Sequence, residues 1–337
     1  MMIGAAAQSR PRENARPERD FDLMKAAGIA WVRMGFRTPF TDASMSATTP
    51  EFQAQEREVE RLERHGLKVM GYSPFPGGDP DIGGHFPDWG GPMGSAAYLD
   101  FYEEVCAWLA ARFQGVADAW QVANEMNRPF WNGGLPPEQG VAFLARGGRG
   151  IKRGNPGALV GVNMAGFGDV AMAMYRRLFP NDTVEFDYIG ADGYMAPEGW
   201  PEKLDQLAAI TDKPIVIQEF GWASKGITLT AEQTRDHPFT SAHDRCRWRG
   251  WQRTWGDHEH TPEDQAEYIA RSMEIFATDP RIIGVFVWRW NDAPRCWLCG
   301  SEECPGTGNW GLVDVDERPK PSFYAFREGA ALLRSRR

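Results

Sequence analysis

The chain has 337 residues, of which 42% are hydrophobic and 25% are charged, and its formal net charge at pH 7 is -9. This is the composition of a globular protein with a sizeable core, and the acidic charge argues against nucleic acid and anionic membranes as partners, because both are bound by clustered Lys and Arg. We expect no membrane span either, since no apolar run reaches the roughly 18 residues that a span requires.

The chain opens with a short apolar stretch, Met1–Gln8, which lacks the basic region and the long apolar region of a secretory signal peptide. The sequence therefore favours a cytoplasmic protein, or a secreted one whose leader lies outside this sequence. Its oligomeric state is left open.

Apolar strands then alternate with amphipathic helices along the chain, and each strand is a continuous apolar run, as expected when both faces are buried. Helix boundaries carry local signals, such as Gly28 and Gly66 after the first two helices. The predicted strands are Met2–Ala7, Ile29–Phe36, Leu67–Ser73, Ala119–Asn124, Ala158–Met164, Phe186–Tyr194, Pro214–Phe220 and Ile282–Trp290. The predicted helices are Pro17–Ala27, Glu51–His65, Ala96–Phe113, Pro137–Arg153, Val170–Leu178, Pro201–Ile210, Thr261–Ala277 and Ser322–Leu333.

This eightfold alternation, without a glycine-rich dinucleotide-binding motif, predicts an α/β fold: a single (β/α)8 TIM barrel, with residues 1–337 forming one catalytic domain. The longest connections, Ala223–His260 after strand seven and Asn291–Pro321 after strand eight, are expected to be functional or ordered by a partner. Active-site residues should lie at the carboxyl ends of the strands.

Two glutamates stand at such ends. Glu125 follows the fourth strand in an Asn-Glu pair, and Glu219 ends the seventh. Across a barrel mouth these carboxyls could flank one glycosidic bond, one protonating the leaving oxygen and the other attacking or activating water. The agreement of two independent positions makes this pattern more specific than either glutamate alone.

The segments around these glutamates, WQVANEMN (Trp120–Asn127) and VIQEFGW (Val216–Trp222), resemble glycoside hydrolase clan A, which includes the cellulase-like family 5 and the family 39 xylosidases. The segment GNWGLVDVDERPKPSFYAF (Gly308–Phe326) is similar to the closing segment of many clan members. The resemblance covers about residues 1–335. It implies a retaining hydrolase of β-glycosidic bonds in an oligo- or polysaccharide, with no cofactor required for catalysis. The sugar, the linkage and endo or exo action are left open.

The resemblance also implies roles for matching residues. Glu125 would be the general acid/base and Glu219 the nucleophile. Asn124 would bind the sugar 2-hydroxyl, while Arg33 and Tyr194 would hold the Glu219 carboxylate in its ionised form.

Trp288 would form the floor beneath the attacked sugar, and Asn163, on the fifth strand, is a further candidate contact with an ordinary structural role as its alternative. The chain departs from the clan pattern at positions that often carry His, where it has Tyr72, Ser73 and Asp192.

Tryptophan is abundant, with 14 residues, many of them in predicted loops. An indole can stack on the C–H face of a sugar, although packing beneath a loop is the more common role for any single Trp. Trp131 and Trp222 are the further candidate sugar contacts.

Four of the five cysteines lie in the two long connections: Cys246, Cys296, Cys299 and Cys304. They could bind a structural zinc ion, form two disulfides or remain thiols, and the spacing leaves all three open. The fifth, Cys106, falls in an apolar helical pattern and is expected to be a buried thiol. The pair His258 and His260 is interpreted as loop chemistry, because a metal-dependent hydrolase would need such a pair on a strand.

Two other functions compete with the glycosidase. A non-catalytic carbohydrate-binding barrel would usually lack one glutamate, whereas both are present. A metal-dependent hydrolase on the same fold would lose activity with a chelator.

Overall fold

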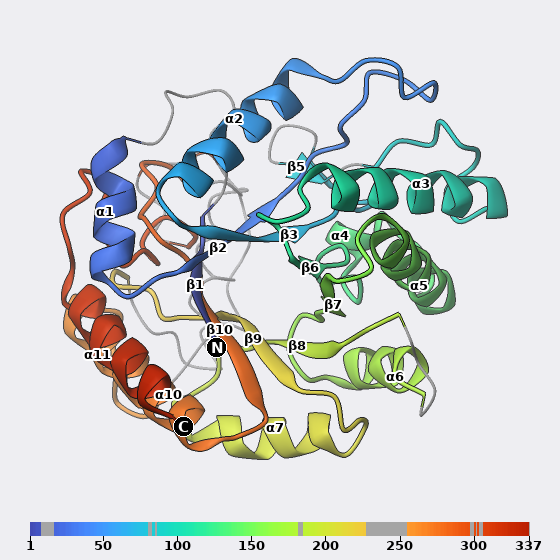
Figure 1. The fold of residues 1–337 in the computed structure, drawn as a ribbon. Coiled ribbons are helices and arrows are strands. Elements are labelled where there is room, and N and C mark those ends of the chain that lie inside the picture. Colours follow the sequence, from blue (N-terminus) through green and yellow to red (C-terminus); the bar gives the residue numbers. More distant parts are fainter. Residues whose placement is uncertain are drawn as a thin grey trace.

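The computed structural model describes residues 1–7, 17–79, 83–84, 86–180, 185–226, 255–296, 300, 302 and 306–336. Its centre is a closed barrel of eight parallel strands, in the order β1, β2, β3, β6, β7, β8, β9 and β10, with β10 pairing back onto β1. Helices surround the strands on the outside (Figure 1). The predicted (β/α)8 barrel is therefore confirmed.

The barrel strands are β1 (Met2–Ala6), β2 (Trp31–Gly35), β3 (Lys68–Tyr72), β6 (Ala119–Gln121), β7 (Leu159–Val162), β8 (Tyr188–Asp192), β9 (Ile215–Phe220) and β10 (Ile282–Val287). The main helices are α1 (Glu18–Ala26), α2 (Pro50–Arg64), α3 (Ala96–Arg112), α5 (Pro137–Gly154), α6 (Asp169–Leu178), α7 (Trp200–Ala208), α10 (Pro262–Thr278) and α11 (Pro321–Ser335). Every predicted strand and helix is found within a few residues of its predicted bounds.

Local chemistry explains where several helices begin and end. The side chains of Thr49, Ser95 and Thr261 accept hydrogen bonds from backbone N–H groups in the first turns of α2, α3 and α10. Gly28 and Gly66, as predicted, follow α1 and α2 with φ of 83° and 72°, a backbone region that glycine adopts without steric cost.

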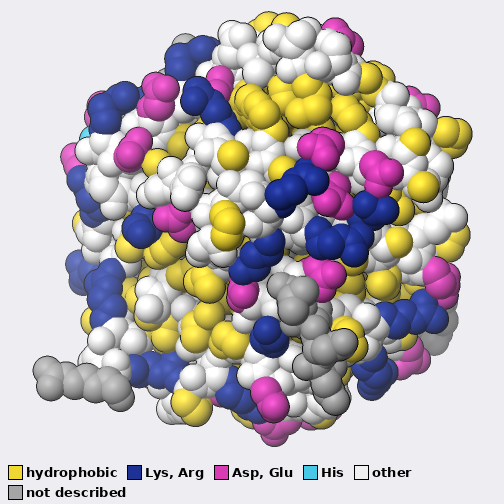
Figure 2. Space-filling model, turned by 45° about the vertical axis from the view of Figure 1, so that its right-hand side comes forward, with side chains coloured by type: hydrophobic (Ala, Val, Ile, Leu, Met, Phe, Trp, Pro, Cys, Tyr) yellow, Lys and Arg dark blue, Asp and Glu magenta, His cyan; other side chains and the backbone are white. Residues whose placement is uncertain are grey.

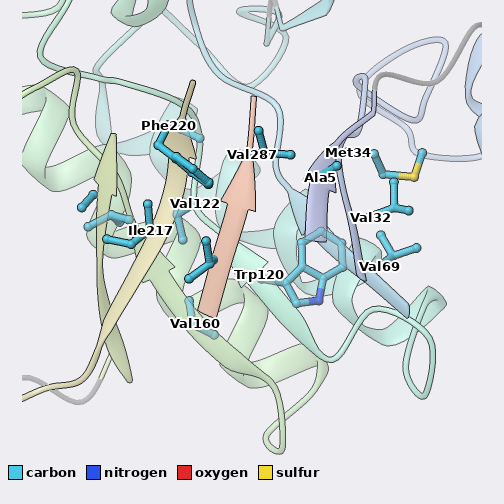
Figure 3. Close-up of a cluster of buried hydrophobic side chains, with 14 of the residues drawn as sticks. Ala5, Val32, Met34, Val69, Trp120, Val122, Val160, Ile217, Phe220 and Val287 are labelled. Atoms are coloured by element: carbon cyan, nitrogen blue, oxygen red, sulfur yellow. The ribbon is translucent and has the colours of Figure 1, made fainter. Parts of the chain in front are cut away.

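Two buried layers hold the barrel together. Outward-facing strand side chains, among them Val32, Val69, Val160 and Ile217, pack in a core shared with the helices (Figure 3). Inside the barrel, Tyr188 lies with Met70 and Phe286, and its hydroxyl donates to the carbonyl of Trp120 at 2.8 Å. Gly161 leaves room for the Tyr188 ring, because a Cβ at position 161 would lie 2.2 Å from that ring.

The strands end earlier than predicted at the site. The predicted Ala119–Asn124 strand stops at Gln121, because Ala123 and Glu125 adopt φ of 55° and 44° and leave the extended conformation. The predicted Ile282–Trp290 strand likewise stops at Val287.

Three short elements were not predicted. They are the β4–β5 hairpin (Gly78–Asp79 and Gly83–Gly84), α4 (Pro129–Asn132) and the 3-10 helix η1 (Pro197–Gly199). Each has too few residues to show a hydrophobic period.

Charged side chains of both signs are mixed on one face of the molecule (Figure 2). On the face that carries α3 and α5, Lys and Arg side chains alternate with Asp and Glu rather than forming a basic field (Figure 2). No helix in the described parts of the chain is both long enough and apolar enough to cross a bilayer.

Candidate active site

The carboxyl ends of five strands bring seven polar side chains together at one end of the barrel. They are Arg33 from β2, Asn124 and Glu125 after β6, Asn163 after β7, Asp192 and Tyr194 at and after β8, and Glu219 from β9. The sequence predicted six of these as site residues. Asp192 was noted only as a departure from the clan pattern.

Both oxygens of the Glu219 carboxylate have hydrogen-bond donors. Arg33 Nη1 donates to Oε1 at 2.8 Å, and the Tyr194 hydroxyl donates to Oε2. Burial lowers the pKa of Arg33, but the negative charges of Glu219 and Asp192 more than reverse this, so that its pKa is raised. Glu219 is therefore held at both carboxyl oxygens, by a guanidinium and by a phenol hydroxyl.

Arg33 is itself held on three sides. Its Nε donates to Gln121 Oε1 and its Nη2 to Asn124 Oδ1, both at 2.8 Å, while its guanidinium lies 5.0 Å from the centre of the Tyr72 ring. Gln121 was missed by the sequence analysis. It also donates through Nε2 to Asn163 Oδ1 at 2.9 Å, and thereby links β2, β6 and β7. A fully buried amide in an apolar strand was the signal that could have revealed it.

Glu125 lies in a different environment. Its backbone N–H donates to Asn163 Oδ1 at 3.0 Å, and its Oε2 accepts from the indole N–H of Trp131 at 2.7 Å. Its φ of 44° is uncommon for a residue with a Cβ, and the bond to Asn163 helps to hold it. Burial, together with the negative charge of Glu219, raises the pKa of Glu125 to about 7.

The two glutamates are close. One carboxyl oxygen of Glu125 lies within 4.8 Å of one of Glu219, and Asp192 contributes a third oxygen within the same limit. Retaining glycosidases hold their two carboxyl groups about 5–5.5 Å apart and inverting ones about 6.5–9.5 Å apart. The two carboxyls are therefore near enough to act on the same bond.

Asp192 is 1% exposed. Its Oδ2 accepts from Asn163 Nδ2 at 2.5 Å, and its Oδ1 has no hydrogen-bond partner within the described part of the chain. Burial first, and then the charges of Glu219 and Glu125, raise its pKa well above its usual range. Only the three-dimensional arrangement shows that it shares a space with both glutamates.

The predicted aromatic contacts lie in different places. Trp131 lies directly against Glu125, and Trp288 packs edge-on against Tyr194 and Trp310, with ring centres 6.0 and 5.3 Å away. Both remain partly exposed at the site.

Trp222 differs from the expectation, because its side chain is fully buried. It stacks on His260, with ring centres 4.6 Å apart, and its indole N–H donates to the carbonyl of Glu259 at 2.9 Å. It packs beneath the connection after β9 and presents no face to a ligand. A loop Trp that fills a satellite core cannot be told from a sugar platform by sequence.

The cysteine prediction falls mostly outside the described residues, which do not include Cys246, Cys299 and Cys304. Cys296 is buried, with its sulfur 3.0 Å from Thr307 Oγ1. Cys106 is a buried thiol in α3, as predicted.

Two clusters of described side chains have the spacing of metal ligands. The first is Glu125, Asp192 and Glu219, where Arg33 and Tyr194 already occupy both oxygens of Glu219. The second is His258, Asp264 and Glu267, and there Asp264 belongs to the start of α10, where it accepts from Thr261 Oγ1 at 2.7 Å. The interpretation of His258 as a loop residue agrees with this position, away from the strand ends.

The fold is a (β/α)8 barrel like that of several solved glycoside hydrolases. Xylanase 10B from Thermotoga petrophila RKU-1, solved with xylobiose, is 18% identical with a TM-score of 0.67, over 98% of this chain and 93% of that one. GH5_18 from Streptomyces cattleya, solved with GlcNAc, is 16% identical with a TM-score of 0.69, over 99% and 80%.

A family 39 glycoside hydrolase from the gut symbiont Bacteroides cellulosilyticus WH2 is 16% identical with a TM-score of 0.65, over 99% of this chain and 64% of that one. No protein-family profile and no curated protein sequence matches the chain. At such identities the likeness establishes the fold.

Proposed function

We propose that the protein is a retaining β-glycoside hydrolase, a single catalytic barrel that cleaves an oligo- or polysaccharide by double displacement, with Glu219 as the nucleophile and Glu125 as the acid/base. One observation carries the proposal. The two carboxyls lie within 4.8 Å of each other but in opposite environments, since Glu219 is held by a cation and a phenol, whereas Glu125 has a pKa raised to about 7. A pair of carboxyls with such different environments divides naturally into an ionised nucleophile and a protonated acid.

In the first step a Glu219 oxygen bonds to the anomeric carbon as the glycosidic C–O bond breaks. Glu125 gives its proton to the leaving oxygen and becomes a carboxylate. In the second step Glu125 takes a proton from water, whose oxygen bonds to the anomeric carbon and releases Glu219. Both glutamates then have their starting protonation, and the sugar keeps its anomeric configuration.

The neighbouring residues serve these steps. Asn124 Oδ1 accepts from Arg33, Gln121 and Asn163, which fixes the orientation of the amide, and its Nδ2 group is proposed to donate to the sugar 2-hydroxyl. That contact strengthens as the oxocarbenium-like transition state forms. Trp288, beside Tyr194, is proposed as the floor for the attacked sugar, and Trp131 as a contact for the leaving group beside the acid.

The chemistry needs no metal, because the carboxyls perform both proton and bond transfer themselves. The competing metal-dependent hydrolase would have to displace Arg33 and Tyr194 from Glu219. A structural zinc ion at the loop cysteines stays a separate alternative.

The test is to screen aryl β-glycosides together with β-glucan, mannan and xylan, and to record by NMR the anomeric configuration of the first product. We expect a β-product from a β-glycoside, and the loss of hydrolysis in Glu219→Gln. An α-product would show inversion and reject Glu219 as the nucleophile.

A further inference from the structure

The candidate site contains one more carboxyl than double displacement uses. Asp192 stands beside Glu125 and Glu219, and one oxygen from each of the three lies within 4.8 Å of the other two. Among the described residues, Arg33 is the guanidinium hydrogen-bonded to this group, and it donates to Glu219. Three ionised carboxyls beside one bonded cation would carry excess negative charge in a buried space, which is far less favourable than keeping protons.

The hydrogen bonds distinguish the carboxyls from one another. Both oxygens of Glu219 already accept a hydrogen bond, from Arg33 and from Tyr194. Asp192 has a donor at Oδ2 only, from Asn163 at 2.5 Å, and its buried Oδ1 has no hydrogen-bond partner within the described residues. A neutral carboxyl at Asp192 would leave far less uncompensated charge at this buried atom than a carboxylate would.

We propose that Asp192 keeps its proton throughout the reaction and acts as a positioning residue, holding Glu125 through Asn163; this rests on the retaining mechanism proposed above. The path is short. Asn163 Nδ2 donates to Asp192, which orients the amide so that Asn163 Oδ1 accepts the backbone N–H of Glu125 at 3.0 Å. That bond anchors Glu125 in its left-handed conformation, with φ of 44°.

The proposal also accounts for the charge of the site during turnover. Before the first step the negative charge lies on Glu219, and after it, when Glu219 is esterified, the charge lies on Glu125. With Asp192 neutral, the three carboxyls carry one negative charge at every stage, and Arg33 balances it.

The other groups around Asp192 do not exchange protons in the working pH range. Those that face it, besides Glu125 and Glu219, are Arg33 from β2, Tyr175 from α6, Tyr188 from β8 and Tyr194 after β8. Burial raises the pKa of each of these tyrosines above its usual value, and Arg33 stays charged. Proton exchange is therefore confined to the carboxyls.

The test compares Asp192→Asn with Asp192→Ala. Asparagine copies the protonated acid, because one amide atom accepts from Asn163 and the other is a donor. We expect Asp192→Asn to keep kcat/KM within about threefold, with the basic limb of its pH profile unmoved. Asp192→Ala releases Asn163 and should lower kcat/KM about a hundredfold on glycosides with poor leaving groups, which depend on Glu125, and much less on activated aryl glycosides.

Two results would overturn the proposal. If Asp192 were ionised, Asp192→Asn would remove a negative charge beside Glu125, and the basic limb would move about one unit or more to lower pH. If Asp192→Asn were as slow as Asp192→Ala, the reaction would require a carboxyl group at this position that a neutral amide cannot replace.

Infrared spectroscopy at pH 7 provides a readout that needs no substrate. In Glu125→Gln protein, Asp192 should give the band of a buried protonated carboxyl, and Asp192→Asn in the same background should remove it. Absence of the band overturns the proposal even if the Asp192→Ala variant does not fold. The band does not depend on turnover, so its absence rejects the proposal for Asp192 alone. A wild-type protein that hydrolyses no glycoside would instead reject the proposed function.

Discussion

Replacing Trp131 by phenylalanine should widen the alkaline range of the enzyme. The indole N–H donates to Glu125 Oε2 at 2.7 Å, and this bond lowers a pKa that burial and Glu219 raise to about 7. A hydrogen bond to a charged group contributes about 1.5–3 kcal/mol. Part of it persists in the protonated acid, so the difference between the two forms is about 1.4 kcal/mol, or roughly one pKa unit.

The sign follows from the role of Glu125. Glycosylation needs the protonated acid, so the rate is lost as the pH rises through its pKa. The Trp131→Phe variant leaves the acid near a pKa of roughly 8, and at pH 8 the protonated fraction rises from about one tenth to about one half. The basic limb of kcat/KM should therefore move to higher pH.

The assay is a pH profile of kcat/KM on a β-glycoside with a poor leaving group, where protonation limits the rate. Phe130→Leu is the matched control, because Phe130 is the exposed neighbour in α4 that packs edge-on against Trp131. The control profile should keep its position. A basic limb in Trp131→Phe that stays put or moves to lower pH would refute the reasoning.

Further substitutions separate the roles of other residues. Arg33→Met leaves Glu219 without its cation and should lower kcat/KM by about a thousandfold, measured by steady-state kinetics with circular dichroism as the check on folding. Lys320→Met leaves the buried Asp292 carboxylate, which lies 3.1 Å from the Lys320 ammonium, without its ion-pair partner. This variant should lower the free energy of unfolding, measured by urea denaturation, by about 3–5 kcal/mol. The double variant Lys320→Met, Asp292→Leu should recover most of that loss of stability. Trp222→Phe should lower that free energy by about 1–3 kcal/mol and leave KM unchanged, because the indole is buried; a raised KM with unchanged stability would restore it as a sugar contact.

The barrel and its paired glutamates were predictable because their signals are local and repeated. Each strand is an apolar run, each helix has its own period, and Glu125 and Glu219 stand where two such runs end. The contacts of Arg33 with Glu219 and of Tyr194 with Glu219 were expected from resemblance, and both are present.

What the sequence did not reveal depends on register between strands or on burial. Gln121 and Asp192 join the site only because β2, β6, β7 and β8 direct their carboxyl ends to the same mouth of the barrel. A left-handed backbone at Glu125 has no local signal, since glutamate rarely adopts it. For Trp222 the sequence predicted a contact that the structure does not offer. Its position in a loop suggested an exposed side chain, whereas the indole is buried against His260.

The most direct test of the central claim uses azide with two variants and an activated aryl β-glycoside. Glu219→Ala cannot form the covalent intermediate, so azide entering the vacated space should attack the substrate and give a glycosyl azide of inverted configuration. Glu125→Ala still forms the intermediate from an activated substrate, and azide should intercept it to give the retained product. Wild-type rates in both variants would contradict the assignment, and azide products with exchanged configurations would require the two roles to be swapped.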